Sequence, residues 1–237
     1  AEAAAHGLLE LIERDAVALW WRGGVEGRAI AADGAAAHAA GEFLAAARGP
    51  EPTGRGVWLL DITTDLGVPT VAALSSNADG RLLACGSAAR PNLASAAVAA
   101  ARDMLHIELA YDVVEAKRRE RGEAALNDTD RRHVERAAQI AVADCPILRP
   151  ALPPRVALDV TPGPTPEPSE TLAALVKRLD DAGVEAFSVD LTRPNFGIPV
   201  VRAVAPQLQL EPCVPTTPRL RAAAKPSTAG SSHISIL

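Results

Sequence analysis

The stretch HGLLELIERDAVALWW, residues 6–21, decides the fold because it has the pattern of an amphipathic helix. At about 100° per residue, the polar residues in and just before this stretch fall within one arc of about 120°. They are Glu2, His6, Glu10, Glu13 and Arg14. The opposite arc is apolar and holds Leu8, Leu9, Leu11, Ile12, Ala16 and Leu19. Because Gly23 and Gly24 favour a helix end, we expect one helix over residues 2–21 with its apolar side against a core.

One acidic residue does not fit this pattern. Asp15 falls at about 220° on the same projection, inside the apolar arc. A buried carboxylate needs partners, because leaving water without them costs free energy. The pattern leaves three roles open for Asp15: it caps a neighbouring element, it orients Arg14, or it lies near the surface.

Downstream of this helix, the sequence predicts a mixture of strands and helices. Strands are expected at 56–63, 68–75, 81–87, 186–192 and 199–205, with a hairpin turn at Asn77–Gly80. Helices are expected around 35–47, over 92–120, over 130–142 with a cap from Asp128–Asp130, and over 169–182. Since these elements do not alternate as strict βαβ units, we expect an α+β or mixed α/β fold rather than a doubly wound sheet.

Composition excludes several classes of protein. The 237 residues, 48% of them hydrophobic, suffice for one large domain or two small ones. No apolar run reaches the length of a membrane span. The net charge of −5 and the aromatic content of 3% give neither a basic footprint nor stacking platforms for nucleic acid. The three cysteines form no C-x-x-C pair, which is typical of a cytoplasmic protein with ordinary thiols.

Three segments look different from the rest. Residues 150–168 hold seven prolines and predict a linker or extended loop, although RVALDV at 155–160 has a strand-like pattern. Residues 212–237 are rich in Pro, Ala and Ser with little to bury, so we expect a disordered tail. The chain starts at Ala1 with helical patterning already present by His6, so we expect the domain to be incomplete at its N-terminus.

The polar arc of the first helix is the sharpest candidate for chemistry. Its plain interpretation is a solvated helix face, on which Glu10 and Arg14 form an i,i+4 ion pair. Its functional interpretation is a carboxylate cluster for Mg²⁺ with a guanidinium for phosphate. The spacing alone leaves both interpretations open.

A second candidate is the polar side of the helix over 92–120, where Asp103 and His106 share a face. Here too a solvated helix side is the plain alternative. The five histidines form no ligand-spaced pair, and the chain has no Walker A loop, no G-x-G-x-x-G after a strand and no G-x-S-x-G. The sequence therefore identifies no catalytic nucleophile or base.

Taken together, these motifs resemble one protein family. Residues 6–21 closely resemble the central helix of YcaO-domain proteins. The segment DITTDLGVP at 61–69, a hairpin and a long helix then follow in that family's order, and GIPVVRAVAP at 197–206 resembles its C-terminal strand. The resemblance covers most of residues 1–211 and implies a YcaO-like domain there, with a sheet packed against helices.

The resemblance implies ATP-dependent activation of a peptide backbone amide. In YcaO proteins the amide oxygen attacks ATP and becomes phosphorylated, a nucleophile adds at the amide carbon, and phosphate leaves. A side-chain nucleophile of the peptide gives an azoline, and sulfide gives a thioamide. The implied substrate is a ribosomally made precursor peptide, and the implied partner is a leader-binding or assisting protein. A homodimer stays open.

Site residues follow from the same resemblance, position by position. Glu2 and Glu10 resemble the family's Mg²⁺-coordinating carboxylates, and Arg14, with Glu10, resembles its nucleotide contact. Asp103 stands where the family usually has a metal-binding Glu, and it keeps the charge with one methylene fewer. Ala99 stands where the family often has a polar residue. The alternative is a catalytically silent YcaO-like scaffold or peptide-binding module.

Overall fold

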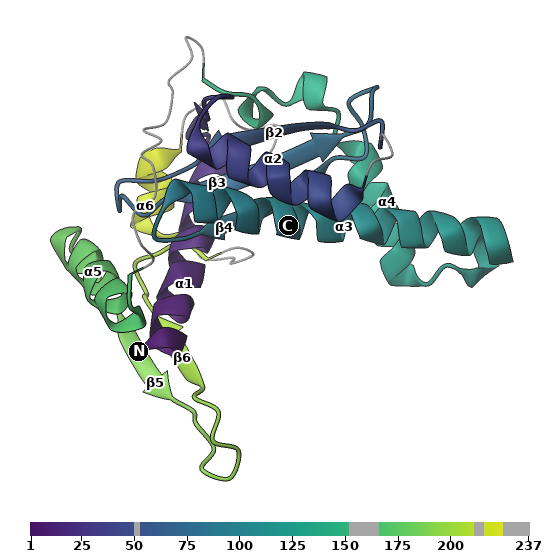
Figure 1. Cartoon of the computed structure of the whole chain (residues 1–237). Coiled ribbons are helices and arrows are strands. Elements are labelled where there is room, and N and C mark those ends of the chain that lie inside the picture. Colours follow the sequence, from purple (N-terminus) through teal and green to yellow (C-terminus); the bar gives the residue numbers. More distant parts are fainter. Residues whose placement is uncertain (50–52, 152–165, 211–215, 225–237) are drawn as a thin grey trace.

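The computed structural model describes residues 1–49, 53–151, 166–210 and 216–224 (Figure 1). Its helices are α1 (Glu2–Trp21), α2 (Ala35–Arg48), α3 (Leu93–Arg121), α4 (Asp128–Gln139), α5 (Pro168–Asp181) and α6 (Pro218–Ala223). Its strands are β1 (Arg28–Ala29), β2 (Gly56–Asp61), β3 (Thr70–Ser76), β4 (Ala84–Ala89), β5 (Phe187–Asp190) and β6 (Val201–Val204). The expected α+β class is confirmed. None of these helices is both long and apolar enough to cross a membrane.

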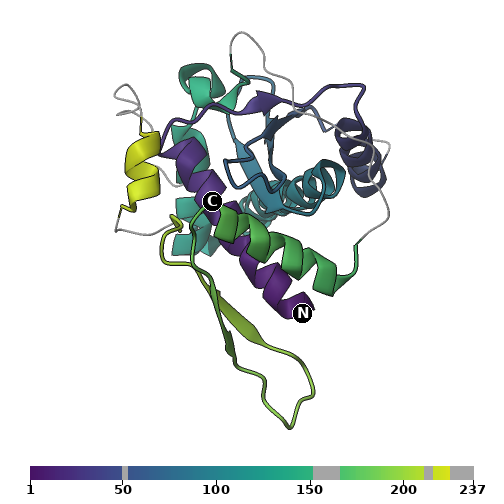
Figure 2. The same ribbon diagram turned by 90° about the vertical axis from the view of Figure 1, so that its left-hand side faces the viewer.

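The main sheet is antiparallel, with the strand order β1-β2-β3-β4. Because side chains alternate across a strand, β3 presents Val71 and Ala73 to one face and Ala72 and Leu74 to the other. Helices α2 and α3 pack on the first face, and the C-terminal half of α1 packs on the second (Figure 2). Strand β4 is left as an edge, with α1 on one side of it and α3 on the other.

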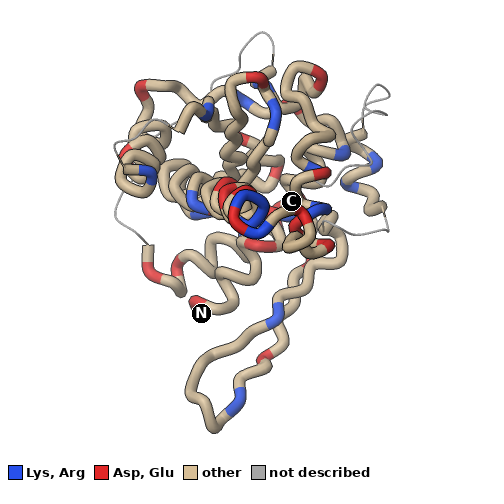
Figure 3. Tube along the Cα trace, turned by 90° about the vertical axis from the view of Figure 1, so that its right-hand side faces the viewer, with Lys and Arg blue, Asp and Glu red and all other residues tan. Residues whose placement is uncertain are grey.

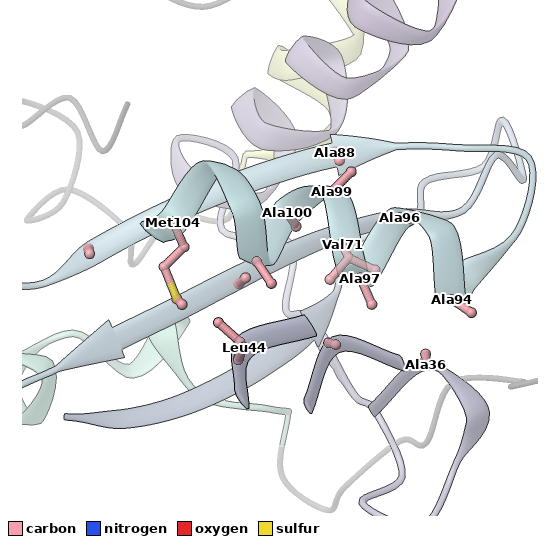
Figure 4. Packing of buried hydrophobic residues seen from close by; sticks show 14 of the residues in the cluster. Ala36, Leu44, Val71, Ala88, Ala94, Ala96, Ala97, Ala99, Ala100 and Met104 are labelled. Carbon is pink, nitrogen blue, oxygen red and sulfur yellow. The ribbon is translucent and has the colours of Figure 1, made fainter. Parts of the chain in front are cut away.

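Small side chains let α2 and α3 lie close to the sheet. Figure 4 shows alanines of α3 gathered with Ala36 and Leu44 of α2 around Val71 of β3. The approach is especially close at Gly86 of β4, because a Cβ there would overlap the backbone N of Met104 and the carbonyl O of Ala100 in α3. A glycine inside a strand often marks such a close backbone approach. Here it brings α3 against the edge strand of the sheet.

The N-terminal half of α1 packs with a second, smaller unit of structure. Helix α5 lies along α1, and the antiparallel pair β5–β6 projects beyond it as a hairpin (Figures 1 and 2). Gly7 of α1 permits this contact, since a Cβ at that position would lie 3.0 Å from Cβ of Ala203 in β6. The hairpin therefore packs against the face of α1 that carries Ala3 and Gly7.

Asp15 of α1 is fully buried, and its partner is Arg219 of α6 rather than Arg14. Arg219 Nη2 lies 2.9 Å from Asp15 Oδ2, and the backbone N–H of Gln209 donates to Oδ1 at 2.8 Å. Burial raises the pKa of Asp15, and the bonds from Arg219 and Gln209 oppose that rise. Of the three roles left open by the sequence, capping a neighbouring element is the closest to what the structure shows. The Asp15 carboxylate binds groups from two later segments of the chain.

Two predictions need correction. Helix α4 is capped by Asn127, whose side chain accepts from the N–H of Asp130 while the Asp130 carboxylate accepts from the N–H of Asn127. This capping box moves the start of the helix to Asp128. Within 212–237, where the composition predicts disorder, α6 is a helix because Thr217 caps it, Leu220 is buried and Arg219 is paired. The strand-like segment 155–160 lies outside the described residues.

Helix α3 depends on Asn92 for its first turn. The Asn92 side chain accepts from the backbone N–H of Ser95 at 2.8 Å, as expected of an N-cap. We expect Asn92→Ala to lower the free energy of unfolding by about 1 kcal/mol. Urea denaturation followed by circular dichroism measures this change. Asn92→Ser keeps a capping oxygen and should stay close to wild type, and an equal loss in both variants would contradict a capping role.

Candidate functional site

A cleft of about 700 Å³ opens along the edge strand β4. Helix α1 forms one wall, α3 forms the other, and β6 contributes at the mouth. The cleft is lined by Ala3, His6, Gly7, Glu10, Glu13, Arg14, Cys85, Gly86, Ser87, Arg90, Asp103, Ile107 and Val201. The polar arc of α1, apart from Glu2, therefore faces a cavity between elements rather than open solvent alone.

Glu13 is the carboxylate most firmly held in this cleft. Its Oε1 accepts a hydrogen bond from the hydroxyl of Ser87 at 2.7 Å, and Oε2 accepts from the backbone N–H of Ala89 at 3.4 Å. Burial raises the pKa of Glu13, and the negative charge of Asp103 adds to the rise, while Ser87, Ala89 and Arg90 oppose it. Burial is the main cause of this rise, and the charge of Asp103 is the smallest contribution to it.

Glu10 and Arg14 lie nearer the surface of the cleft. Arg14 Nη2 is 2.5 Å from Glu10 Oε1, with the two side chains 41% and 59% exposed. This is the i,i+4 pair of the plain interpretation, and at this exposure such a pair contributes little to stability. Because both residues also line the cleft, the pair is compatible with either interpretation.

Arg90 lines the cleft although no sequence motif indicated it. It follows β4 directly, and its backbone N–H donates to the carbonyl of Pro69 at 3.0 Å. Nη1 donates to the carbonyl of Ala89 at 2.7 Å, while Nε and Nη2 have no partner among the described residues. Its charge helps to lower the pKa of Glu13. The available signal was its place between a strand end and the capping residue Asn92.

Other polar groups near the cleft are less suited to chemistry. Cys85 lines it, but burial raises the pKa of its thiol to about 12, so it is not a thiolate nucleophile at neutral pH. Glu108 of α3 is buried away from the cleft, where it forms ion pairs with Arg48 and Arg55. His106 is not among the residues that line the cleft.

The structure brings three of the four predicted site residues to one place. Glu10, Arg14 and Asp103 line the cleft together. Glu2 lies exposed in the first turn of α1 and is not one of the lining residues. Its role as a metal ligand stays a prediction.

The donor set of the cleft fits a Mg²⁺–phosphate group. Among the residues that the structure describes, no three His, Cys, Asp or Glu side chains converge as a ready-made metal cage. Mg²⁺ does not need one, since it usually keeps several waters and binds one or two carboxylates plus phosphate oxygens. Glu13 and Asp103 both line the cleft and carry oxygens of this kind. Arg14 and Arg90 supply donors for phosphate.

A model of the YcaO cyclodehydratase family, described as ATP- and Mg²⁺-binding, matches residues 1–209. The chain belongs to the YcaO family. That family's binding of ATP and Mg²⁺ agrees with the carboxylates and guanidinium groups of the cleft. A search of curated protein sequences found no match.

Solved structures carry the same fold as this YcaO chain. A heterocyclase in complex with substrate and cofactor is 25% identical, with a TM-score of 0.67, over 87% of this chain and 26% of its own. The heterocyclase TruD is 23% identical, with a TM-score of 0.69, over 90% of this chain and 28% of its own. YcaO from Methanopyrus kandleri, bound with AMPPCP and Mg²⁺, is 20% identical, with a TM-score of 0.54, over 85% of this chain and 50% of its own. The chain thus spans between about a quarter and half of these structures.

Outside the cleft, the described residues carry charges of both signs. In the view of Figure 3, acidic and basic residues are interspersed along the chain, and the projecting hairpin carries few of either. This distribution agrees with the low net charge of −5.

Proposed function

We propose that this YcaO chain takes part in the ATP- and Mg²⁺-dependent activation of a backbone amide in a ribosomally made peptide. The product would be an azoline by cyclodehydration or a thioamide. The observation that carries the proposal is the cleft along β4, where carboxylates of α1 and α3 face Arg14 and Arg90. The membership of the chain in an ATP- and Mg²⁺-binding family supports it.

The acidic and arginine residues of the cleft each have a defined part in this proposal. Bound ATP and Mg²⁺ would supply the phosphoryl group that turns an amide oxygen into a leaving group, with the phosphate charge neutralised. Glu13, fixed by Ser87 and Ala89, and Asp103 would hold the cation from opposite walls. Arg90 would bind phosphate oxygens through Nε and Nη2. Arg14 would do the same, with Glu10 as its neighbour on the helix.

The peptide and its helpers belong to the proposal as well. A solved heterocyclase of 25% identity binds a substrate and a cofactor, and we propose that the substrate of this chain is a peptide. A leader-binding or assisting partner protein, and action in the cytoplasm, complete the proposal.

A catalytically silent YcaO scaffold is the second candidate. It is favoured by the absence, among the described residues, of a three-ligand metal cluster and by the Glu10–Arg14 pair, which engages both side chains. The two candidates differ in one measurable property. The silent scaffold binds no Mg²⁺·ATP, whereas the enzyme does.

Calorimetry with Mg²⁺·ATP on the full chain tests the proposal. We expect saturable binding by the wild type and a Kd about tenfold or more higher for Arg90→Met, because charge-assisted hydrogen bonds to phosphate are lost. Arg81→Met is the matched control, since Arg81 is an exposed arginine that bonds the carbonyl of Ala138, away from the cleft. Wild-type protein that binds no nucleotide with Mg²⁺ present would favour the silent scaffold.

A further inference from the structure

A C-terminal segment outside the matched family region holds the helix that carries the site. The family match ends at residue 209, and α6 lies beyond it at Pro218–Ala223. Arg219 of this helix is only 17% exposed, and its Nε and Nη2 both donate to the fully buried carboxylate of Asp15. The pair joins two residues that are 204 positions apart in the sequence.

Further bonds fix Arg219 and α6 in place. The same guanidinium donates to both carboxylate oxygens of Asp65, at 3.0 and 2.7 Å, so Asp65 holds its outer side. The buried side chain of Gln209 accepts from the backbone N–H of Thr217 at 2.8 Å, and Thr217 caps α6. The N–H of Gln209 in turn donates to Asp15. We call Thr217–Ala223 the C-terminal clasp.

The clasp and the cleft hold opposite sides of α1. Glu13 and Asp15 are two residues apart, which separates their side chains by about 200° around the helix. Glu13 is bonded to Ser87 on the cleft side, and Asp15 is bonded to Arg219 on the other side. An aspartate has a single methylene, so its carboxylate cannot reach water unless the backbone of α1 moves. Any such movement would displace Glu13 and Arg14 as well.

Removing Arg219 would leave Asp15 as a buried charge without its cation. Breaking a buried pair on one side is strongly unfavourable, whereas removing both charges together is often tolerated. We propose that Arg219 is a positioning residue, which acts through Asp15 to set the place of Glu13 and Arg14 in the cleft. The effect on nucleotide affinity rests on the proposed function, whereas the effect on α1 itself does not.

Two measurements on the full chain test this role. The first is amide hydrogen exchange of residues 10–15 in α1, and the second is the Kd for Mg²⁺·ATP, both well below the melting temperature of each variant. For Arg219→Met we expect exchange to be about tenfold faster and the Kd about tenfold higher. Arg221→Met is the matched control, because Arg221 lies on the same helix, is exposed and bonds the carbonyl of Thr216. It should behave like wild type.

A double variant separates charge pairing from simple packing. In Asp15→Asn with Arg219→Met no buried charge is left unpaired, so we expect exchange and Kd to return to within about threefold of wild type. Arg219→Met that matches Arg221→Met in both measurements would overturn the proposal. So would a double variant that shows no recovery.

Two outcomes need a further comparison: an Arg219→Met variant that does not fold, and a wild type that binds no Mg²⁺·ATP. If Arg219→Met does not fold, Asp65→Asn removes only the exposed partner of Arg219, and we expect exchange in α1 about threefold faster than wild type. Unchanged exchange in that variant would overturn the positioning role. If the wild type binds no Mg²⁺·ATP, the proposed function fails, and the exchange comparison alone decides the role of the clasp.

Discussion

Gly86→Ala is expected to lower the free energy of unfolding by about 3 kcal/mol, near the upper end of overpacking costs in protein cores. The added Cβ would overlap the backbone N of Met104 and the carbonyl O of Ala100. Both are backbone atoms of a helix, so no side chain can rotate away to make room. Helix α3 would have to move off β4, which would also carry Asp103 away from Glu13. Urea denaturation measures the stability loss.

A second glycine offers a matched control for this prediction. Gly41 lies within α2, and a Cβ there would meet no atom within 4 Å. Gly41→Ala should raise the free energy of unfolding by about 0.5–1 kcal/mol, because alanine has the higher helix propensity. If Gly86→Ala were as stable as wild type, α3 and β4 would not approach as closely as the structure shows.

Gly86 and Gly41 differ in their surroundings in a way that the sequence alone does not show. Both interrupt apolar patterns, and only one marks a close backbone approach. A glycine within a strand often marks such an approach, but this rule does not name the partner of Gly86. The partner, α3, follows from the pairing of Gly86 with Ala73, which lies on the sheet face that α2 and α3 cover. That pairing is a property of strand register rather than of any local pattern.

Local patterns predicted local structure well. The 3.6-residue period placed α1 over Glu2–Trp21, and the strand–turn–strand pattern placed β3 and β4 as a hairpin, because both depend on neighbours in the sequence. The cap of α4 was misplaced by one residue, since Asn127 and Asp128 are both good capping residues and only the reciprocal bond with Asp130 decides between them.

Long-range electrostatics could not be predicted in the same way. The position of Asp15 in the apolar arc left a buried acid and a residue near the surface both open, and the structure shows the buried acid. Nothing near it in the sequence indicated Arg219, because the short helix that carries this residue has too few turns to show a period. Arg90 was missed for a related reason, since its place in the cleft depends on the packing of β4 between α1 and α3. The candidate site is therefore only partly visible in the sequence.

Glu13→Gln is expected to separate function from stability in the cleft. Glutamine keeps the size of the side chain and an oxygen that can accept from Ser87, but it removes the charge. Because burial and Asp103 both disfavour that charge, the variant should be at least as stable as wild type. The gain in ATP affinity that Mg²⁺ brings should fall by about 100-fold, which corresponds to about 2.8 kcal/mol.

The measurement compares the Kd for ATP in excess Mg²⁺ with the Kd in EDTA, for wild type and for Glu13→Gln. Under the proposed function, Glu13 and Asp103 would give the cation hard oxygen ligands in the wild type, so Mg²⁺ should tighten ATP binding strongly. In the variant only the cation's contact with Asp103 remains in the cleft centre, and the ratio of the two Kd values should approach one. Glu42→Gln, on the exposed side of α2, is the control and should keep the wild-type ratio. A full Mg²⁺ effect in Glu13→Gln would exclude Glu13 as a ligand and move the cation toward Glu10 or Glu2.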